Sequence, residues 1–335
     1  MTSPLNADLV LEGGGVKGIA LAGAISVLEE HGYQFHKVAG TSAGAIVGAL
    51  VAAGAPAKRL REIMEDLDYR RFRDPGVLGR MGPLGAAAEV LLHRGWCRGD
   101  YLRAWLGEKL GEYTVDTFAQ LRLDDPGADS TLHDRDRSYR FVAMASDITH
   151  GELVRLPWSY RPRFGVDPDS VRVVDAVGAS MSIPFFFRPS RCPDGPGGRV
   201  AWLVDGGMLS NFPIDVFDRT DGAAPRWPTF GIKLAARGEA TKVNQVRGIV
   251  SLSKAMLLTM TGFYDRLHVG RPEVVDRTIF VDTGDVRATD FDLSPAGADW
   301  LYESGRAAAT RFLDGWDFEE YQRRHRPGGL GQTVA

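Results

Sequence analysis

The chain has 335 residues, of which 44% are hydrophobic and 25% are charged, so it holds enough apolar material for the core of one large or two ordinary domains. Its formal net charge is only -3 and its pI is about 6.2, which argues against a nucleic-acid partner because no basic field surrounds the protein. The two cysteines, Cys97 and Cys192, are too few for a disulfide framework or a zinc site, and they fit a reducing, intracellular compartment.

The N-terminus and the apolar runs bear on localisation. Residues 1–7 lack the basic and apolar regions of a secretory signal, so we expect a cytoplasmic protein. The longest apolar run, residues 38–55, contains a glycine turn and is too short to span a bilayer. Two stretches that mix arginines with aromatic residues, 69–73 and 160–164, suit contact with anionic headgroups, although solvated loops are the simpler interpretation. Any membrane contact is therefore expected to be peripheral and transient.

The N-terminal part of the chain alternates strands and helices. An apolar strand at residues 8–11 leads into a glycine loop, and Ile19 begins a helical apolar pattern that ends at Gly32. A second strand at residues 33–39 is followed by a glycine turn and a helix over residues 45–53. This order predicts a parallel sheet covered by helices on both faces.

The middle of the chain is predicted to lie outside the sheet. Residues 58–69 show an amphipathic helical pattern, residues 74–85 are rich in glycine and proline and are expected to be irregular, and Asp100 is predicted to be the N-cap of a further helix. We expect residues 58–137 to form a helical cap or lid over a site, with a polar, solvated loop at residues 124–137.

The remaining elements are predicted to complete one domain. Strands are expected at residues 139–146, 152–156, 199–204, 229–234 and 278–282. Helices are expected at residues 171–180 and 243–269 and from Ser294 to Gly315. The chain shows no repeat and no linker that would divide it, so we expect a single domain over residues 1–315, followed by a flexible polar tail over residues 316–335.

The stretch Gly40-Thr41-Ser42-Ala43-Gly44 joins the second strand to the helix that follows it. A serine in such a sharp turn projects its hydroxyl from the end of a sheet, and the helix directs its positive end at the serine. The pattern is weak by itself in a chain with 40 glycines, where Ser42 would otherwise be an ordinary small turn residue. The hydroxyl also needs a base. None of the seven histidines supports a Ser-His-Asp triad, although His150 lies in a predicted turn.

A glycine loop, Gly13-Gly14-Gly15-Val16-Lys17-Gly18, follows the first strand directly. Consecutive glycines allow backbone N–H groups to converge on an anion. A dinucleotide site would need an acid at the end of the second strand, where Gln34-Phe35-His36-Lys37 stands instead, and a P-loop would need lysine and a hydroxyl residue after its last glycine. An oxyanion hole beside a nucleophile is therefore the better interpretation.

The stretch Val204-Asp205-Gly206-Gly207-Met208 contains an acid at the end of a predicted strand, on the edge where parallel sheets form their sites. An aspartate whose pKa is raised by partial burial can accept a serine proton directly. A structural turn aspartate is the competing interpretation. That interpretation is the favoured one for Asp147, which begins the turn that ends at Gly151.

These three motifs, in this order, resemble the patatin-like phospholipase family. The segment Ala179-Ser180-Met181-Ser182-Ile183-Pro184 and the run from Asp205 to Pro213 are also similar to the family's pattern. The resemblance extends from about Ala7 to Leu313. It implies an α/β fold of three layers, α/β/α, with a mainly parallel central sheet.

The resemblance also implies roles for individual residues. Ser42 would be the nucleophile and Asp205 its base, in a Ser-Asp dyad. The backbone N–H groups of Gly13, Gly14 and Gly15 would form the oxyanion hole, and Lys17 occupies the basic position of the loop. The glycines that support the motifs are Gly18, Gly40, Gly44, Gly206 and Gly207. No metal and no other cofactor is expected.

The expected function is that of a serine esterase, a lipid acyl hydrolase of phospholipase A type that cleaves fatty-acyl esters of membrane glycerophospholipids through an acyl-enzyme. Its expected partners are the phospholipid or another lipid ester, the membrane surface, and a regulatory partner or lid, because an unregulated phospholipase would endanger its own membrane. Phe185, Phe186 and Phe187 could receive an acyl chain, although adjacent aromatics more often belong to a core. A catalytically silent lipid-binding module and a dinucleotide-binding oxidoreductase are the alternatives.

Overall fold

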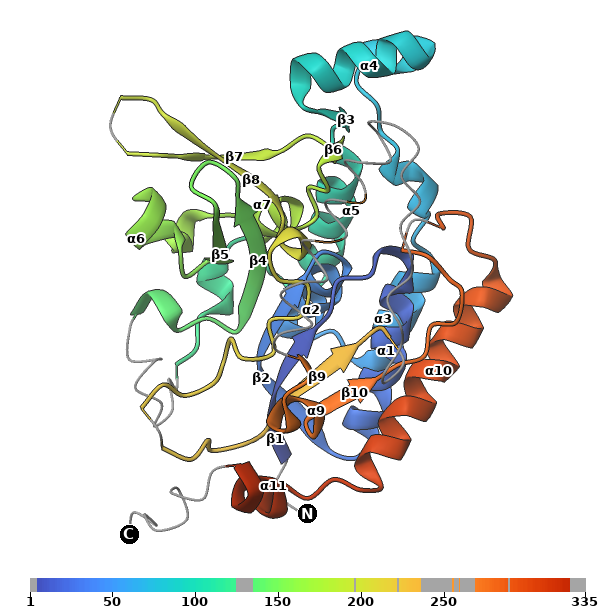
Figure 1. Cartoon of the computed structure of the whole chain (residues 1–335), viewed down its shortest axis with the longest axis vertical. Coiled ribbons are helices and arrows are strands. Elements are labelled where there is room, and N and C mark those ends of the chain that lie inside the picture. Colours follow the sequence, from blue (N-terminus) through green and yellow to red (C-terminus); the bar gives the residue numbers. More distant parts are fainter. Residues whose placement is uncertain are drawn as a thin grey trace.

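The computed structural model describes residues 5–124, 135–195, 197–221, 223–235, 269–288 and 290–325, with the isolated positions 255 and 259. Almost all of the helix predicted at residues 243–269, and most of the polar loop predicted at residues 124–137, lie outside the described residues. The described elements form a mixed α/β structure (Figure 1).

An eight-stranded sheet forms the centre of the described structure. Five neighbouring strands run parallel: β10 (Thr278–Phe280), β9 (Thr229–Lys233), β1 (Leu5–Leu11), β2 (Tyr33–Thr41) and β4 (Phe141–Asp147). Three further strands join through antiparallel pairings: β5 (Glu152–Leu156), β8 (Val200–Asp205) and β7 (Ser190–Pro193). A separate parallel pair consists of β3 (Gly95–Cys97) and β6 (Phe185–Phe187). The mainly parallel central sheet is thereby confirmed, whereas β3, β6 and β7 were not predicted.

Two strands meet end to end along one edge of β4. On this edge, β2 pairs with β4 as far as Met144 and β8 pairs with it from Ala145 onward. The opposite edge of β4 pairs with β5. Because β8 runs antiparallel to β4, its last residue, Asp205, faces the end of β2. The strand before Asp205 was expected to be parallel, and that prediction is wrong. The acid reaches the site because the two strand ends oppose each other.

Helices cover one face of the sheet. They include α1 (Gly18–Glu30), α2 (Ala43–Ala53), α3 (Ala57–Glu65), α5 (Asp100–Gly111), α7 (Val173–Ser180) and α10 (Pro295–Leu313). Nearly every residue of α1 and α2 is buried, since these helices lie between the sheet and further helices. Figure 1 shows α1, α3 and α10 side by side on this face.

The opposite face of the sheet presents Val10, Ala39, Val142 and Met144. Among the described residues, it is covered by apolar side chains of the segment 212–217 and by α9 (Pro272–Val275). The short helix α6 (Tyr160–Phe164) follows β5 and buries both of its terminal aromatic rings.

The segment between α3 and α5 differs from its prediction. Helix α4 (Gly82–His93) begins within residues 74–85, which were expected to be irregular. Asp100 is the first helical residue of α5 and not its cap. The carboxylate of Asp74 performs that function instead, because it accepts hydrogen bonds from the N–H groups of Gly99 (2.9 Å), Asp100 (2.7 Å) and Tyr101 (3.1 Å).

The C-terminal segment also differs from its prediction. Helix α11 (Phe318–His325) occupies part of the stretch that was expected to be a flexible tail. Tyr321 is buried against Trp316, with 5.4 Å between the ring centroids, and its hydroxyl donates to the carbonyl of Glu273 (3.1 Å). The expected start of α10 is confirmed, since the Ser294 hydroxyl accepts a hydrogen bond from the N–H of Gly297 (3.1 Å). No helix in the described parts of the chain has both the length and the apolar character needed to cross a membrane.

Candidate active site

Ser42 occupies the turn between β2 and α2, as its motif predicts. Its φ of 53° and ψ of -121° are unfavourable for a residue with a Cβ atom, and such strain persists only where the surrounding structure enforces it. The side chain is 7% exposed and lines a cavity. The backbone N–H of Ser42 donates to the Ser180 hydroxyl (2.9 Å), which ties the turn to the end of α7.

Gly40 and Gly44 allow the turn to pack closely. A Cβ atom on Gly40 would lie 2.2 Å from the carbonyl oxygen of Gly44. A Cβ atom on Gly44 would lie 2.4 Å from the carbonyl oxygen of Leu11 on β1. Both contacts are with backbone, which cannot move aside without displacing a strand or a helix. The two glycines therefore hold α2 against the sheet directly behind Ser42.

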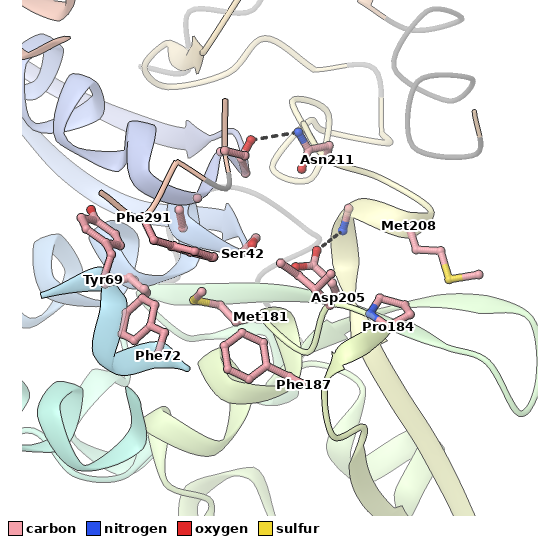
Figure 2. A pocket seen from close by; sticks show the side chains of 18 of the residues that line it. Ser42, Tyr69, Phe72, Met181, Pro184, Phe187, Asp205, Met208, Asn211 and Phe291 are labelled. Carbon is pink, nitrogen blue, oxygen red and sulfur yellow. Dashed lines mark hydrogen bonds between the residues drawn. The ribbon is translucent and has the colours of Figure 1, made fainter. Parts of the chain in front are cut away.

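Asp205 lies at the end of β8 and lines the same cavity (Figure 2). Burial raises the pKa of its carboxyl to about 6, while hydrogen bonds from the N–H of Gly207 (2.7 Å) and from the Ser42 hydroxyl act in the opposite direction. Gly206 permits the bend after Asp205, since a Cβ atom there would lie 2.3 Å from the carbonyl oxygen of Met144. The arrangement provides a carboxylate beside a serine hydroxyl, with a proton affinity well above that of an exposed aspartate.

The glycine loop presents fewer donors than expected. The N–H of Gly13 donates to the carbonyl of Asn211 (3.2 Å), and the Asn211 side chain donates back to the carbonyl of Gly13 (3.0 Å; Figure 2). Gly13 is therefore engaged and is not available to an oxyanion. The N–H groups of Gly14 and Gly15 have no hydrogen-bond acceptor among the described residues. These two donors remain for a ligand.

Lys17 and Gly18 support the loop from outside the cavity. The Lys17 ammonium donates to the Thr283 hydroxyl (2.9 Å), which connects the loop to the segment after β10. Gly18 begins α1, where a Cβ atom would press against the Met64 side chain at 3.0 Å. Neither residue lines the cavity, so the structure indicates a supporting role for both.

The cavity in front of Ser42 has a volume of about 330 Å³ and a largely apolar wall. Its larger apolar residues include Ile46, Met64, Tyr69, Phe72, Met181, Ile183, Phe187 and Phe291. The three consecutive phenylalanines divide: Phe187 lines the cavity, Phe186 stacks on Phe291 with 5.8 Å between the ring centroids, and Phe185 is exposed. Such a wall suits a hydrocarbon chain.

No histidine occurs in the described lining of the cavity. His150 instead binds the buried Asp147, with 2.8 Å between Nδ1 and the carboxylate. Asp147 also accepts the N–H groups of Thr149 (2.9 Å) and His150 (3.2 Å), as expected for an aspartate that begins a turn. Sequence reasoning did not assign functions to Ser180 and Asn211, although both lie in segments similar to the family's pattern.

The comparison with protein families decides how these features are to be interpreted. The sequence model of the family described as patatin-like phospholipase matches residues 9–218, a range that includes the glycine loop, Ser42 and Asp205. The chain belongs to the patatin-like phospholipase family. This membership leaves no reason to retain the dinucleotide-binding interpretation of the glycine loop.

Two curated proteins and a solved structure match nearly the whole chain. The uncharacterized protein YqhO of Bacillus subtilis (strain 168) is 34% identical over 311 residues, covering 93% of this chain and 99% of the relative. The cGAMP-activated phospholipase of Pseudomonas aeruginosa is 24% identical and covers 91% of this chain and 88% of that protein. The crystal structure of VipD from Legionella pneumophila covers 93% of this chain and 67% of its own, with a TM-score of 0.52 and 20% identity, so it supports the fold.

Proposed function

We propose that this patatin-like protein is a phospholipase A-type serine esterase that cleaves fatty-acyl esters of glycerophospholipids through a Ser42–Asp205 dyad. Family membership supports lipid acyl hydrolase activity. The observation that carries the finer proposal is the strained Ser42 beside the buried Asp205 carboxyl, at the wall of an apolar cavity. A serine hydroxyl becomes nucleophilic when a positioned base takes its proton.

The first half-reaction forms an acyl-enzyme. The Asp205 carboxylate accepts the proton of the Ser42 hydroxyl while Oγ attacks the ester carbonyl carbon. The N–H groups of Gly14 and Gly15 hold the resulting oxyanion, assisted by the N-terminus of α2. When the tetrahedral intermediate collapses, the C–O bond to the glycerol breaks and the leaving alkoxide takes the proton from Asp205. The fatty acyl group stays on Ser42 as an ester.

The second half-reaction releases the fatty acid. Asp205 takes a proton from a water molecule, and the resulting hydroxide attacks the carbonyl carbon of the acyl-enzyme, whose oxygen lies in the same oxyanion hole. Collapse of this intermediate breaks the bond to Ser42 Oγ, which recovers its proton from Asp205. The raised pKa of Asp205 suits this alternation, because a carboxyl that is protonated and deprotonated in each turnover works best near the ambient pH.

We further propose that the segment 58–137 regulates access to the cavity as a lid. Met64, Tyr69 and Phe72 contribute to the wall, so any displacement of this segment would open the cavity on that side. The single-domain organisation over residues 1–315 and transient attachment to a membrane surface from the cytoplasm belong to the same proposal.

The test is a product profile from mixed membrane glycerophospholipids, measured by mass spectrometry. Wild-type protein is expected to release free fatty acid and lysophospholipid, and Ser42→Ala and Asp205→Asn are each expected to lower the rate at least about 1,000-fold because they remove the nucleophile and its base. A fluorophosphonate should label the wild type on Ser42. A near-wild-type rate in either variant would show that the dyad is misassigned.

Ser210→Ala is the matched control for this test. Ser210 is fully buried near the site, and its carbonyl accepts a hydrogen bond from the Thr41 hydroxyl (3.2 Å). The hydroxyl oxygen of Ser210 has no hydrogen-bond partner in the described structure. Its removal should preserve both turnover and labelling. Wild-type protein that neither labels nor turns over lipid, while still binding vesicles, would favour the catalytically silent lipid-binding module.

A further inference from the structure

Helix α4 has its polar and apolar sides reversed. Leu84 is 88% exposed and Leu91 is 83% exposed, and Leu92 is exposed as well. The only buried residue of α4 is Glu89, a carboxylate that is 1% exposed. A surface helix normally buries its leucines and exposes its charges. Figure 1 shows α4 projecting from the body of the molecule beyond β3 and β6.

A polar anchor holds α4 in this orientation. Glu89 forms an ion pair with Arg188 and accepts a hydrogen bond from the N–H of Gly79 (3.2 Å). Gly76 packs directly on it, since a Cβ atom there would lie 2.0 Å from the Glu89 carboxylate oxygen. The attachment of α4 to the protein thus uses charge and backbone contacts. Its leucines contribute little to that attachment and remain available to a partner.

The exposed apolar surface continues beyond α4. We define the α4 face as Val77, Met81, Leu84, Leu91, Leu92 and Phe185, all of which are exposed. Phe185 belongs to this face because β6 pairs it with Gly95, which follows α4 closely in the chain. Its φ of 68° is unfavourable for a bulky side chain, and this backbone conformation accompanies a ring that points outward. Exposed apolar surface of this extent marks an interaction site.

Residues 77–94, which hold most of the α4 face, contain no exposed acidic residue. Residues 77–94 contain a single acidic residue, Glu89, which is buried and paired with Arg188. Arg80 and Arg94 are exposed, and neither has a carboxylate within 4 Å in the part of the chain that the structure describes. A symmetric contact with a second copy would bring these arginines close to their counterparts. A bilayer that contains anionic lipid complements both the leucines and the arginines.

The chain connects the α4 face to the cavity in front of Ser42 at two places. Phe72 lines the cavity, and Val77 of the α4 face follows it five residues later in the chain. In β6, Phe185 belongs to the face and Phe187, two residues later, lines the cavity. A surface on which the α4 face rests would therefore lie close to the cavity that is proposed to receive an acyl chain.

We infer that the α4 face docks this protein on an anionic lipid bilayer, with α4 lying in the headgroup region and its leucines among the acyl chains. The choice of a lipid surface rests on the proposed function. A helix of 12 residues is too short to span a bilayer, so it lies along the interface.

The test is co-sedimentation of the full chain with vesicles of phosphatidylcholine, with and without phosphatidylglycerol. All proteins carry Ser42→Ala so that the vesicles stay intact. The parent protein is expected to bind the anionic vesicles more tightly. Leu84→Ser/Leu91→Ser/Leu92→Ser should lower the partition coefficient about tenfold or more, because three exposed side chains lose their apolar burial. Arg80→Ala/Arg94→Ala should remove about tenfold of the preference for anionic vesicles.

Matched controls remove the same chemistry elsewhere. Ile148→Ser/Trp300→Ser deletes exposed apolar side chains outside the α4 face, and Arg323→Ala/Arg324→Ala deletes two exposed arginines on α11. Both controls should bind vesicles as the parent does. In the background that retains Ser42, the leucine and arginine variants should hydrolyse a soluble short-chain ester at the wild-type rate and lose activity only on vesicles.

Three outcomes overturn the docking inference. The first is vesicle binding by the leucine variant that equals the parent's. The second is a parent that binds no vesicles at all. The third is a dimer in light scattering that the leucine substitutions dissociate while vesicle binding is unchanged, which would assign the α4 face to a second copy. Absence of turnover in wild-type protein that still binds through the α4 face would refute the proposed function and leave the docking inference intact.

Discussion

Burial gives Asp205 its chemistry. The carboxyl is buried where two strand ends oppose each other, and its hydrogen-bond donors among the described residues are the N–H of Gly207 and the Ser42 hydroxyl. Its pKa therefore rises to about 6, because removal of water destabilises the charged form more than these two donors stabilise it. Such a residue is a stronger base than an exposed aspartate and is still largely ionised at neutral pH.

The pH dependence of activity follows from this pKa. Asp205 must be deprotonated to accept the Ser42 proton, so kcat/KM on a soluble ester should rise with pH through an apparent pKa near 6 and reach a plateau above it. Below that pKa the rate should fall about tenfold per pH unit. A profile that is flat from pH 5 to pH 8 would exclude Asp205 as the base. Ser210→Ala should shift neither the plateau nor the midpoint.

The contacts of the individual site residues explain which of their positions could be predicted. The motif around Ser42 is legible in the sequence because the turn excludes every Cβ atom at Gly40 and Gly44. The engagement of Gly13 was not predictable, since it depends on a hydrogen bond to Asn211, far along the chain. The contact of Ser180 with Ser42 was not predictable for a similar reason, because its hydroxyl reaches the Ser42 N–H only after α7 has packed beside α2.

Among the elements, α4 and α5 show where local patterns mislead. The start of α4 is rich in glycine and proline, and its leucines face outward, so the helix lacks the inward apolar stripe that usually reveals one. Helix α5 has a suitable acid at its first position, Asp100, but its N–H groups bind Asp74, which lies well before it in the chain. A local capping rule cannot find a cap supplied from another segment.

Asp74→Ala is expected to lower the free energy of unfolding by about 1–2 kcal/mol, because three backbone N–H groups at the start of α5 lose their acceptor. Asp100→Ala is the comparison. Asp100 is exposed and, among the described residues, pairs with Arg98 alone (2.6 Å), so its removal should change stability by less than about 0.5 kcal/mol. Chemical denaturation of the two variants measures the difference. Equal effects would mean that Asp74 does not cap α5.

At the scale of the whole molecule, the chain beyond the family match contributes to the same sheet. β9 and β10 follow residue 218, where the family match ends. β9 pairs with β1, β10 pairs with β9, and α10 packs on α1. Helix α11 then closes this end of the molecule over α9, through the Tyr321 hydroxyl and through His325, whose Nε2 lies 2.9 Å from the Asp276 carboxylate. The C-terminal segment is thus part of the packed structure as far as His325.

Tyr321→Ala should therefore destabilise the protein. The substitution removes a buried ring packed on Trp316 and a hydrogen bond to Glu273, which together are worth about 3 kcal/mol. The midpoint of thermal unfolding should fall by several degrees. Glu319→Ala, on the same helix but with an exposed side chain, should leave the midpoint unchanged. If both variants melt with the wild type, α11 does not contribute to the packed structure.

Features that depend on near neighbours could be predicted from the sequence. The alternation of strands and helices over residues 8–53, the turn at Ser42 and the glycines around it follow from apolar periodicity and from steric limits within a few residues. Other features became visible only in the tertiary structure: the end of β8 opposes the end of β2, Asp205 is buried, Asn211 forms hydrogen bonds with Gly13, and α4 exposes its leucines. Those properties depend on which distant segments come into contact, because burial and long-range hydrogen bonds are properties of the packed chain and leave no periodic mark in the sequence.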